Sequence, residues 1–204
     1  MEVVAGPMFS GKTEELLRRM RRATLAKQTV MLFKPVRDDR HGTTDVVSHD
    51  ARRQNAIALD SSSDVERQVA QAHPRPDVVG IDEVQFFDDD IVSVCNRLAD
   101  DGIRVIVAGL DLDYLGRPFG IMPLLLAHAE YVTKLNAICS RTGRPAHFSH
   151  RIEGGSEDVQ IGGAESYEAL SREPYNDVVV RDHHRGATAE CRQTDSPSKP
   201  SPTN

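Results

Sequence analysis

Eight residues near the amino terminus have the types and spacing of a phosphate-binding loop. The segment from Gly6 to Thr13 reads Gly-Pro-Met-Phe-Ser-Gly-Lys-Thr, which fits the pattern of a glycine, any four residues, and then Gly-Lys-Thr. Glycines let the backbone turn several N–H groups inward, so that they form a nest for an anion. The Lys12 ammonium can reach the β- and γ-phosphates of a nucleotide, and the Thr13 hydroxyl can join the shell of Mg²⁺. The pattern predicts a nucleotide site rather than a chance glycine turn.

Two adjacent acids, Asp82 and Glu83, could supply the chemistry that such a loop lacks. They follow the apolar run Val78–Ile81, and an acid at the carboxyl end of a buried strand is placed to hold Mg²⁺ beside a phosphate-binding loop. Glu83 is one residue further on and can take the proton from an attacking hydroxyl or position a water molecule. The alternative is that both acids cap the following helix or pair with surface lysines. The nearby nucleotide loop favours the catalytic interpretation.

Three further charged residues follow predicted strands. Asp38 and Arg40 lie in the segment KPVRDDR, and Asp111 ends the segment VIVAGLD. The carboxyl ends of parallel strands line the ligand crevice of an open sheet, and Arg40 could neutralise charge on a transferring phosphoryl group. An ordinary polar loop remains the alternative for all three.

The elements that must position these residues alternate between strand and helix, which favours parallel βαβ units. The expected strands are Glu2–Ala5, Thr29–Pro35, Ala56–Leu59, Asp77–Asp82 and Ile103–Asp111. The expected helices are Lys12–Ala26, Ser63–Ala72, capped by a serine, and Asp89–Asp101, ended by Gly102. A short helix and one more strand are expected within residues 120–138, and Arg37–Ala51 is expected to be a polar loop. We predict an α/β fold of the P-loop NTPase type, a parallel sheet flanked by helices with a small C-terminal lobe.

Changes in composition divide the chain into three parts. We expect residues 1–136 to form the nucleotide-binding domain and residues 137–180, rich in Gly, Ser and Arg, to form a small lobe. Residues 181–204 are rich in Pro, Ser and Thr without an apolar period, which is typical of a disordered tail. Four arginines of the first helix are expected to form a solvated face: Arg18, Arg19, Arg21 and Arg22.

The bulk composition excludes several classes of protein. The 204 residues carry a formal net charge of −6, which argues against a general binder of nucleic acid or membrane surfaces. The chain has 3 cysteines at wide spacing, which is not a disulfide framework. No apolar run approaches the roughly 18 residues that a membrane helix needs, and we expect no signal peptide before the first strand. A cytoplasmic location is expected.

Six segments occur in one order over about residues 2–175: GPMFSGKT, KPVRDDR, IDEVQFF, AGLDLDYLGRPFG, KLNAICSRTG and IGGAESYEAL. On these segments the chain resembles the cellular (type II) thymidine kinases. The resemblance implies transfer of the γ-phosphate of ATP to the 5′-hydroxyl of thymidine or deoxyuridine, which gives dTMP in pyrimidine salvage. It also implies ATP and Mg²⁺ as cofactors and a homotetramer.

The resemblance implies roles for individual positions. It makes Glu83 the general base, and we expect Lys12 and Arg40 to be the other catalytic residues. The ATP site would comprise Gly6, Pro7, Met8, Phe9, Ser10, Gly11, Lys12, Thr13, Asp38, Asp82, Glu83, Val84 and Gln85, with Thr13 and Asp82 at the Mg²⁺. The nucleoside site would comprise Met8, Gln85, Phe86, Leu110, Tyr114, Phe119, Ser149, Val159, Gln160, Ile161, Gly162, Gly163 and Tyr167. The last members of this set belong to a loop, called the lasso, that closes over the base.

The small lobe departs from the family. Thymidine kinases of this type commonly hold a structural zinc ion with two Cys-x-x-Cys pairs, but the matching segments here read Cys139-Ser-Arg-Thr and Ser-Arg-Glu-Pro174. Thr, Ser and Pro cannot supply the thiolates of a tetrahedral zinc site, so only Cys139 is retained and we predict a lobe that folds without zinc. The alternative is a site rebuilt from nearby histidines: His147, His150, His183 and His184.

Two other functions stay open at this point. A P-loop ATPase that drives a partner would need a sensor or arginine-finger element, and the sequence shows no clear sign of one. A non-catalytic nucleotide-binding regulator would not need Lys12, Thr13, Asp82 and Glu83 together. A coupled assay with thymidine, deoxyuridine and other nucleosides separates these hypotheses.

Overall fold

A six-stranded parallel sheet forms the centre of the molecule. The computed structural model describes residues 1–36, 45–47, 53–152 and 166–179. The sheet has the order β5-β2-β6-β7-β1-β8. Its strands are β1 (Glu2–Ala5), β2 (Val30–Pro35), β5 (Ile57–Leu59), β6 (Val78–Ile81), β7 (Arg104–Gly109) and β8 (Tyr131–Lys134). The predicted parallel α/β fold is confirmed, and the five strands predicted by range match to within two residues at each end.

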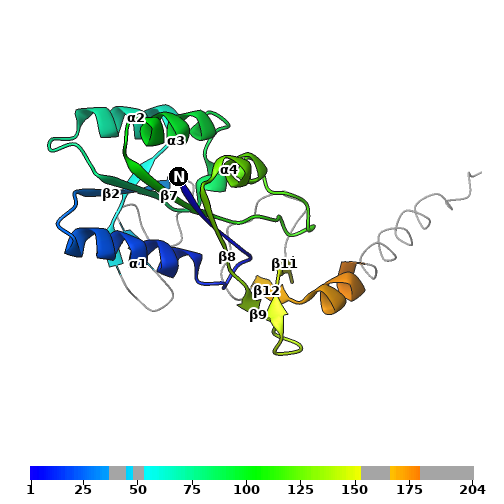
Figure 1. The fold of residues 1–204 in the computed structure, drawn as a ribbon. Helices are drawn as coiled ribbons and strands as arrows, with labels where there is room; N and C mark the ends of the chain where they lie inside the picture. Colours follow the sequence, from blue (N-terminus) through cyan, green and yellow to red (C-terminus); the bar gives the residue numbers. More distant parts are fainter. Residues whose placement is uncertain (37–44, 48–52, 153–165, 180–204) are drawn as a thin grey trace, which may run out of the picture.

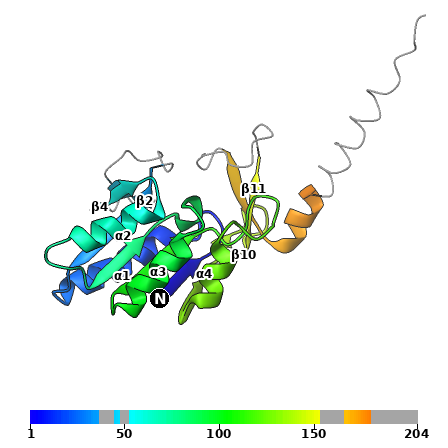
Figure 2. The same ribbon diagram turned by 90° about the horizontal axis from the view of Figure 1, so that it is seen from above.

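Helices cover both faces of this sheet (Figures 1 and 2). Helix α1 (Lys12–Leu25) lies on one face, and α2 (Ser62–Gln71), α3 (Ile91–Asp100) and α4 (Met122–His128) lie on the other. Successive strand residues point to opposite faces, so Val3 packs in the cluster under α3 and α4 while Val4 packs with α1. No helix of the described residues is long and apolar enough to cross a bilayer.

Short-range chemistry sets the helix boundaries. Helix α2 begins after Ser61, whose side chain accepts a hydrogen bond from the Asp64 N–H, as the predicted serine cap requires. Helix α3 ends near Gly102, which has a φ of 83° and donates its N–H to the Ala99 carbonyl. A left-handed glycine after a helix is a common stop signal. The predicted cap and stop are both confirmed.

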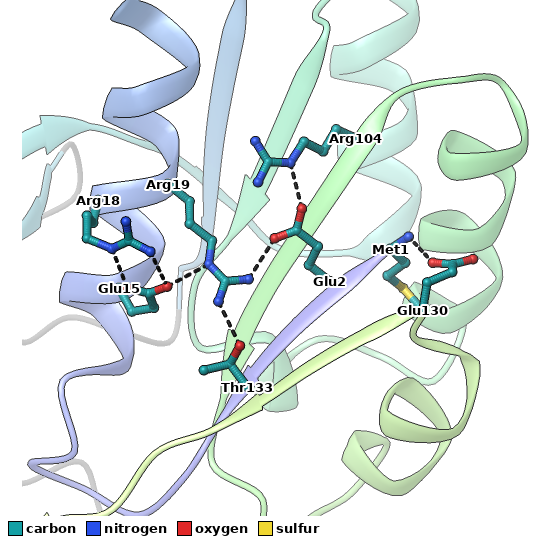
Figure 3. A network of polar contacts seen from close by, with 8 residues as sticks. All are labelled: Met1, Glu2, Glu15, Arg18, Arg19, Arg104, Glu130 and Thr133. Atoms are coloured by element: carbon teal, nitrogen blue, oxygen red, sulfur yellow. Dashed lines mark hydrogen bonds and ion pairs between the residues drawn. The ribbon is translucent and has the colours of Figure 1, made fainter.

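The prediction that the arginines of α1 form a solvated face is wrong for Arg19. Its side chain is only 12% exposed and lies 2.6 Å from Glu2 Oε2 and 2.8 Å from Glu15 Oε1. It also donates to Thr133 Oγ1 at 2.8 Å (Figure 3). These partners come from β1, α1 and β8, so Arg19 ties the helix to the edge of the sheet. The other arginines of the set are exposed. Helical periodicity could not reveal this burial, because it depends on β8 lying beside β1.

A short antiparallel pair lies beyond β2. It consists of β3 (Asp45–Val47) and β4 (Arg53–Asn55). The prediction of an irregular loop over Arg37–Ala51 is therefore wrong at β3, whose partner strand begins outside the predicted segment. The rest of that segment lies outside the described residues.

The small lobe has its own apolar cluster. It contains β9 (Ala137–Ile138), β10 (Pro145–Ala146), β11 (Phe148–Arg151), β12 (Tyr167–Leu170) and a helical segment over residues 172–179. The Phe148 ring stacks on Tyr175 with centroids 4.2 Å apart, and both residues are buried among small apolar side chains. The predicted boundaries of this lobe and of the tail remain predictions, since residues 180–204 lie outside the described part.

Candidate functional site

The predicted phosphate-binding loop joins β1 to α1. Gly6 and Gly11 both have positive φ, 152° and 82°. A Cβ at Gly6 would lie 2.5 Å from the Leu135 carbonyl oxygen, so a larger residue does not fit there. The Lys12 side chain is 8% exposed and its ammonium donates to the Pro7 carbonyl at 2.8 Å. The loop therefore curls around its own lysine, in the P-loop NTPase arrangement that holds phosphates with backbone N–H groups, a helix N-terminus and an ammonium.

Two other residues of the loop face the small lobe. The Met8 N–H donates to Ser149 Oγ at 2.9 Å, and Ser149 is 4% exposed. Phe9 has a φ of 64° and packs against the apolar cluster of the lobe. Ser10 donates its hydroxyl to the Pro7 carbonyl at 2.7 Å and so braces the turn. The loop that would hold the phosphates is thus in direct contact with the lobe expected to close over the nucleoside.

Oxygen ligands suited to Mg²⁺ meet beside the loop. The Thr13 hydroxyl donates to Asp82 Oδ2 at 2.9 Å, and Asp82 Oδ1 accepts from the Glu83 N–H at 3.0 Å. Asp82 is 4% exposed. Mg²⁺ prefers oxygen ligands and is usually held by one or two protein groups together with phosphates and water. A hydroxyl and a buried carboxylate at the entrance of a phosphate nest fit that ion.

Glu83 lies in a constrained turn immediately after β6. Its φ and ψ are 48° and 41°, in the left-handed region, and it opens a short 3₁₀ helix, η2 (Val84–Phe86). Its side chain makes no capping hydrogen bond to that helix. Instead Glu83 Oε2 accepts from Gln85 Nε2 at 2.6 Å, and Gln85 Oε1 accepts from the Leu110 N–H at 3.1 Å. The structure therefore does not support the interpretation of Glu83 as a side-chain cap.

The order of the strands explains why these groups meet. β7 lies between β1 and β6 and is parallel to both, so the carboxyl ends of these three strands lie side by side at the same end of the sheet. The phosphate-binding loop leaves from β1, Asp82 and Glu83 from β6, and Leu110 from β7.

The residues predicted near the nucleoside lie partly on the segment after β7. Phe119 meets Phe86 edge to face, with ring centroids 5.9 Å apart, and donates its N–H to the Asp111 carbonyl at 3.1 Å. The Tyr114 ring lies under the Arg151 guanidinium, 3.8 Å from its centroid. The Tyr114 carbonyl accepts from the Tyr175 hydroxyl at 3.1 Å. This segment thereby connects η2 with the small lobe.

Tyr167 is buried within the lobe. It is 8% exposed and pairs with Arg151 across the two-stranded sheet of β11 and β12. In the same sheet Ser149 points to the phosphate-binding loop, while the neighbouring Phe148 points into the lobe cluster, as alternation along a strand requires.

Several predicted site residues lie outside the described residues. They are Asp38, Arg40, Val159, Gln160, Ile161, Gly162 and Gly163, and their roles remain predictions.

Asp111 is a buried carboxylate at the end of β7. It is 5% exposed, and Lys134 Nζ lies 2.7 Å from its Oδ2. Neither carboxylate oxygen accepts a well-directed hydrogen bond from a described residue, so the contact is an ion pair at close range with poor hydrogen-bond angles. Asp111 therefore links the end of β7 to the end of β8 rather than lying in an exposed polar loop.

Three of the four positions that correspond to zinc ligands come together. Ser171 donates its hydroxyl to Cys139 Sγ at 3.5 Å, and Thr142 Oγ1 lies 3.3 Å from Ser171 Oγ. Burial raises the pKa of the Cys139 thiol, but hydrogen bonds from Thr142, Ser171 and backbone N–H groups lower it by more. Together they bring the pKa from the ordinary value of 9.0 down to about 6. Hydroxyls in place of two thiolates do not fit a tetrahedral zinc site. In the described part of the chain, no group of three or more His, Cys, Asp or Glu side chains could hold a metal ion.

The histidines do not rebuild such a site where they are described. His150 Nδ1 lies 3.1 Å from Glu168 Oε1, and Glu168 also pairs with Arg141. His183 and His184 lie outside the described residues.

Sequence reasoning missed two contacts that organise the site. It assigned no role to Arg151, whose guanidinium lies over the Tyr114 ring. It also assigned none to Gly109, where a Cβ would lie 2.6 Å from Gln85 Oε1. A glycine at the end of an otherwise apolar strand was the available signal for the second contact, because such a glycine often marks a close approach.

The chain is similar over most of its length to known proteins. The family model described as Thymidine kinase matches residues 1–175. A thymidine kinase of Bacteroides fragilis is 48% identical over 185 residues, 91% of each chain. One of Rhodothermus sp. is 52% identical over 172 residues, 84% of this chain and 79% of its own. One of Deinococcus deserti is 48% identical over 194 residues, 89% of this chain and 95% of its own.

Similarity to solved structures is weaker. DnaA from Aquifex aeolicus with bound AMPPCP is 14% identical, with a TM-score of 0.37, over 66% of this chain and 39% of its own. The family model covers most of the chain, and the relatives are close to half identical to it over most of their length. This chain belongs to the thymidine kinase family.

Proposed function

We propose that this chain is an ATP-dependent nucleoside kinase that transfers the γ-phosphate of ATP to the 5′-hydroxyl of thymidine or deoxyuridine. With thymidine the product is dTMP, formed in pyrimidine salvage. One observation supports the proposal most directly: the Thr13–Asp82 hydrogen bond joins the predicted phosphate-binding loop to a buried carboxylate, and Glu83, the residue proposed as the general base, is next to that carboxylate. The identity of the nucleoside substrate is inferred from the family and from the relatives, which are thymidine kinases.

The residues present account for each part of the transfer. The N–H groups between Gly6 and Thr13 and the Lys12 ammonium bind the phosphates. Thr13 and Asp82 would hold Mg²⁺, which when bound neutralises phosphate charge. Glu83 accepts the proton of the 5′-hydroxyl as that oxygen bonds to the γ-phosphorus and the bond to the β–γ bridging oxygen breaks, leaving ADP. Arg40 is proposed to neutralise charge on the same phosphoryl group.

The residues proposed to bind the nucleoside include aromatic and polar groups. Phe86 and Phe119 meet edge to face, and Ser149 accepts a hydrogen bond from the phosphate-binding loop. A kinase must exclude water during transfer, because ATP is otherwise hydrolysed. The Met8–Ser149 hydrogen bond supports a role of the small lobe in that closure, together with the lasso residues Val159–Gly163.

Substrate panels with one variant test the proposal. Wild-type protein with ATP and Mg²⁺ should form a nucleoside monophosphate from thymidine or deoxyuridine. Glu83→Gln should lose about 10²–10⁴-fold in kcat, the usual contribution of a general base, while a non-hydrolysable ATP analogue still binds. Glu66→Gln, which removes a surface carboxylate paired with Arg97 on α3, is the matched control and should keep wild-type turnover.

Two results would contradict this assignment. ATP hydrolysis that does not depend on any nucleoside would favour an ATPase, and a fully active Glu83→Gln variant would remove Glu83 as the base.

We also propose a cytoplasmic homotetramer, as the family resemblance implies. In the described sheet β8 pairs only with β1, and Tyr131 and Val132 on this edge are 70% and 49% exposed. Cys95 and Cys139 are free thiols, which suits a reducing compartment. Light scattering should give the mass of four 22.5 kDa chains, and a monomer mass at assay concentration would contradict the tetramer.

A further inference from the structure

The amide of Gln85 joins the end of one strand to the proposed base of the reaction. Gln85 is 6% exposed. Its Nε2 donates to Glu83 Oε2 at 2.6 Å, and its Oε1 accepts from the Leu110 N–H at 3.1 Å. Both ends of the amide are therefore engaged inside the protein, although the resemblance places this residue near the nucleoside.

The orientation of this amide follows from its neighbours. The Leu110 N–H can only donate, so the oxygen of the Gln85 amide must face it. The amino group must then face the Glu83 carboxylate, which accepts when ionised. A flipped amide would oppose two donors at one end and two acceptors at the other.

The surrounding space also restricts the amide. Gly109 leaves room for it, since a Cβ at that position would lie 2.6 Å from Gln85 Oε1 and 2.9 Å from Met122 Sδ. The side chain of Gln85 thus occupies a slot between β7 and η2 that has no spare volume on the strand side.

We propose that Gln85 is a positioning residue that orients the Glu83 carboxylate, rather than a residue that reads the nucleoside. The proposal rests on the proposed role of Glu83 as the base. The Glu83 side chain is long and flexible, so its backbone alone does not fix the position of the carboxylate. The hydrogen bond from Gln85 Nε2 holds one carboxylate oxygen in place.

The substitution Gln85→Glu tests the proposal with little change in shape. It keeps an oxygen for the Leu110 N–H but replaces the donor to Glu83 by a second acceptor. We expect kcat to fall at least about tenfold, a typical effect of losing one catalytic contact, with the KM for ATP unchanged. The KM for thymidine should also stay close to the wild-type value, because the substitution removes the support of the base and not a contact with the nucleoside.

A second variant and a double variant complete the experiment. Gln85→Met removes both hydrogen bonds without adding charge and should also lower kcat, with the KM for ATP and for thymidine unchanged. Adding Gln85→Glu to Glu83→Gln should cause no further loss, because residues that act as a unit are not additive. Melting curves and binding of an ATP analogue establish that each variant is folded.

The outcomes separate this inference from the proposed function. A fully active Glu83→Gln overturns the role of Glu83 itself. An inactive Glu83→Gln together with a Gln85→Glu variant of wild-type kcat overturns only the positioning role. A raised KM for thymidine with an unchanged kcat in Gln85→Glu would instead assign Gln85 to nucleoside binding, and it too overturns the inference.

Discussion

The substitution Gly109→Ala displaces the Gln85 amide without altering it. The added Cβ would lie 2.6 Å from Gln85 Oε1, whereas an ordinary carbon–oxygen contact is about 3.3–3.6 Å. The oxygen must therefore move by roughly 0.7–1.0 Å. The bonds from Leu110 at 3.1 Å and to Glu83 at 2.6 Å cannot both survive a movement of that size.

The expected loss is larger in turnover than in stability. Overfilling a packed site costs about 1–3 kcal/mol, and the low end applies because the crowded atoms of Gln85, Met122 and Val84 all belong to side chains. A hydrogen bond to a charged group contributes about 1.5–3 kcal/mol, which corresponds to a fall in kcat of roughly 10–100-fold if the Glu83 contact breaks. The KM for ATP should stay within about twofold, because the phosphate-binding loop leaves from another strand.

Denaturant unfolding and steady-state kinetics measure both effects, and Gly102→Ala is the control. Gly102 has a φ of 83° and no atom within 4 Å of an added Cβ, so alanine there costs about 1–2 kcal/mol of backbone strain and leaves kcat unchanged. The reasoning is refuted if Gly109→Ala keeps wild-type kcat, or if both alanine variants lose turnover equally.

Three further predictions concern the rest of the molecule. Hydrogen bonds from Arg18 and Arg19 hold the pKa of Glu15 at about 2, below the ordinary value of 4.5, despite burial that raises it; the stability they add is complete above pH 4.5 and is lost as the pH falls toward 2. Glu15→Gln should lower the unfolding free energy by about 1 kcal/mol at neutral pH, as expected for a partly exposed pair. This difference from the wild type should vanish as the pH falls from 4.5 to 2, and a difference that does not change with pH would contradict the stabilising role of the two hydrogen bonds. Ser149→Ala leaves the Met8 N–H without its acceptor and should lower kcat/KM for thymidine about fivefold, for a loss of about 1 kcal/mol; equal values in Ser149→Ala and Ser149→Thr would contradict the contact. EDTA should leave the melting temperature unchanged and metal analysis should find no stoichiometric zinc, whereas about one zinc per chain would show a rebuilt site.

Short-range patterns were sufficient wherever the determining groups are close in sequence. The loop from Gly6 to Thr13 is built from its own glycines and lysine, and Ser61 and Gly102 set helix ends through neighbours within four residues. The predicted strands matched because continuous apolar runs must be buried. β3 was missed because its partner strand lies outside the polar segment in which it occurs.

Contacts between distant segments could not be predicted in the same way. The burial of Arg19 requires β8 to lie beside β1, and the Gln85–Leu110 bond requires η2 to lie against the end of β7. Parallel strands are joined by long crossovers, so apolar patterns show that a strand is buried but not which strands lie next to it.

The sequence by itself therefore determined a phosphate loop on a strand–helix junction, two acids after another buried strand, and the replacement of three zinc-ligand cysteines. These properties depend on residue chemistry and on contacts within a few positions. Only the tertiary structure decided that Gln85 faces Glu83, that Ser149 reaches Met8, and that Asp111 pairs with Lys134. Those contacts join segments that are far apart in the sequence, and they form only when the sheet, its helices and the small lobe pack together.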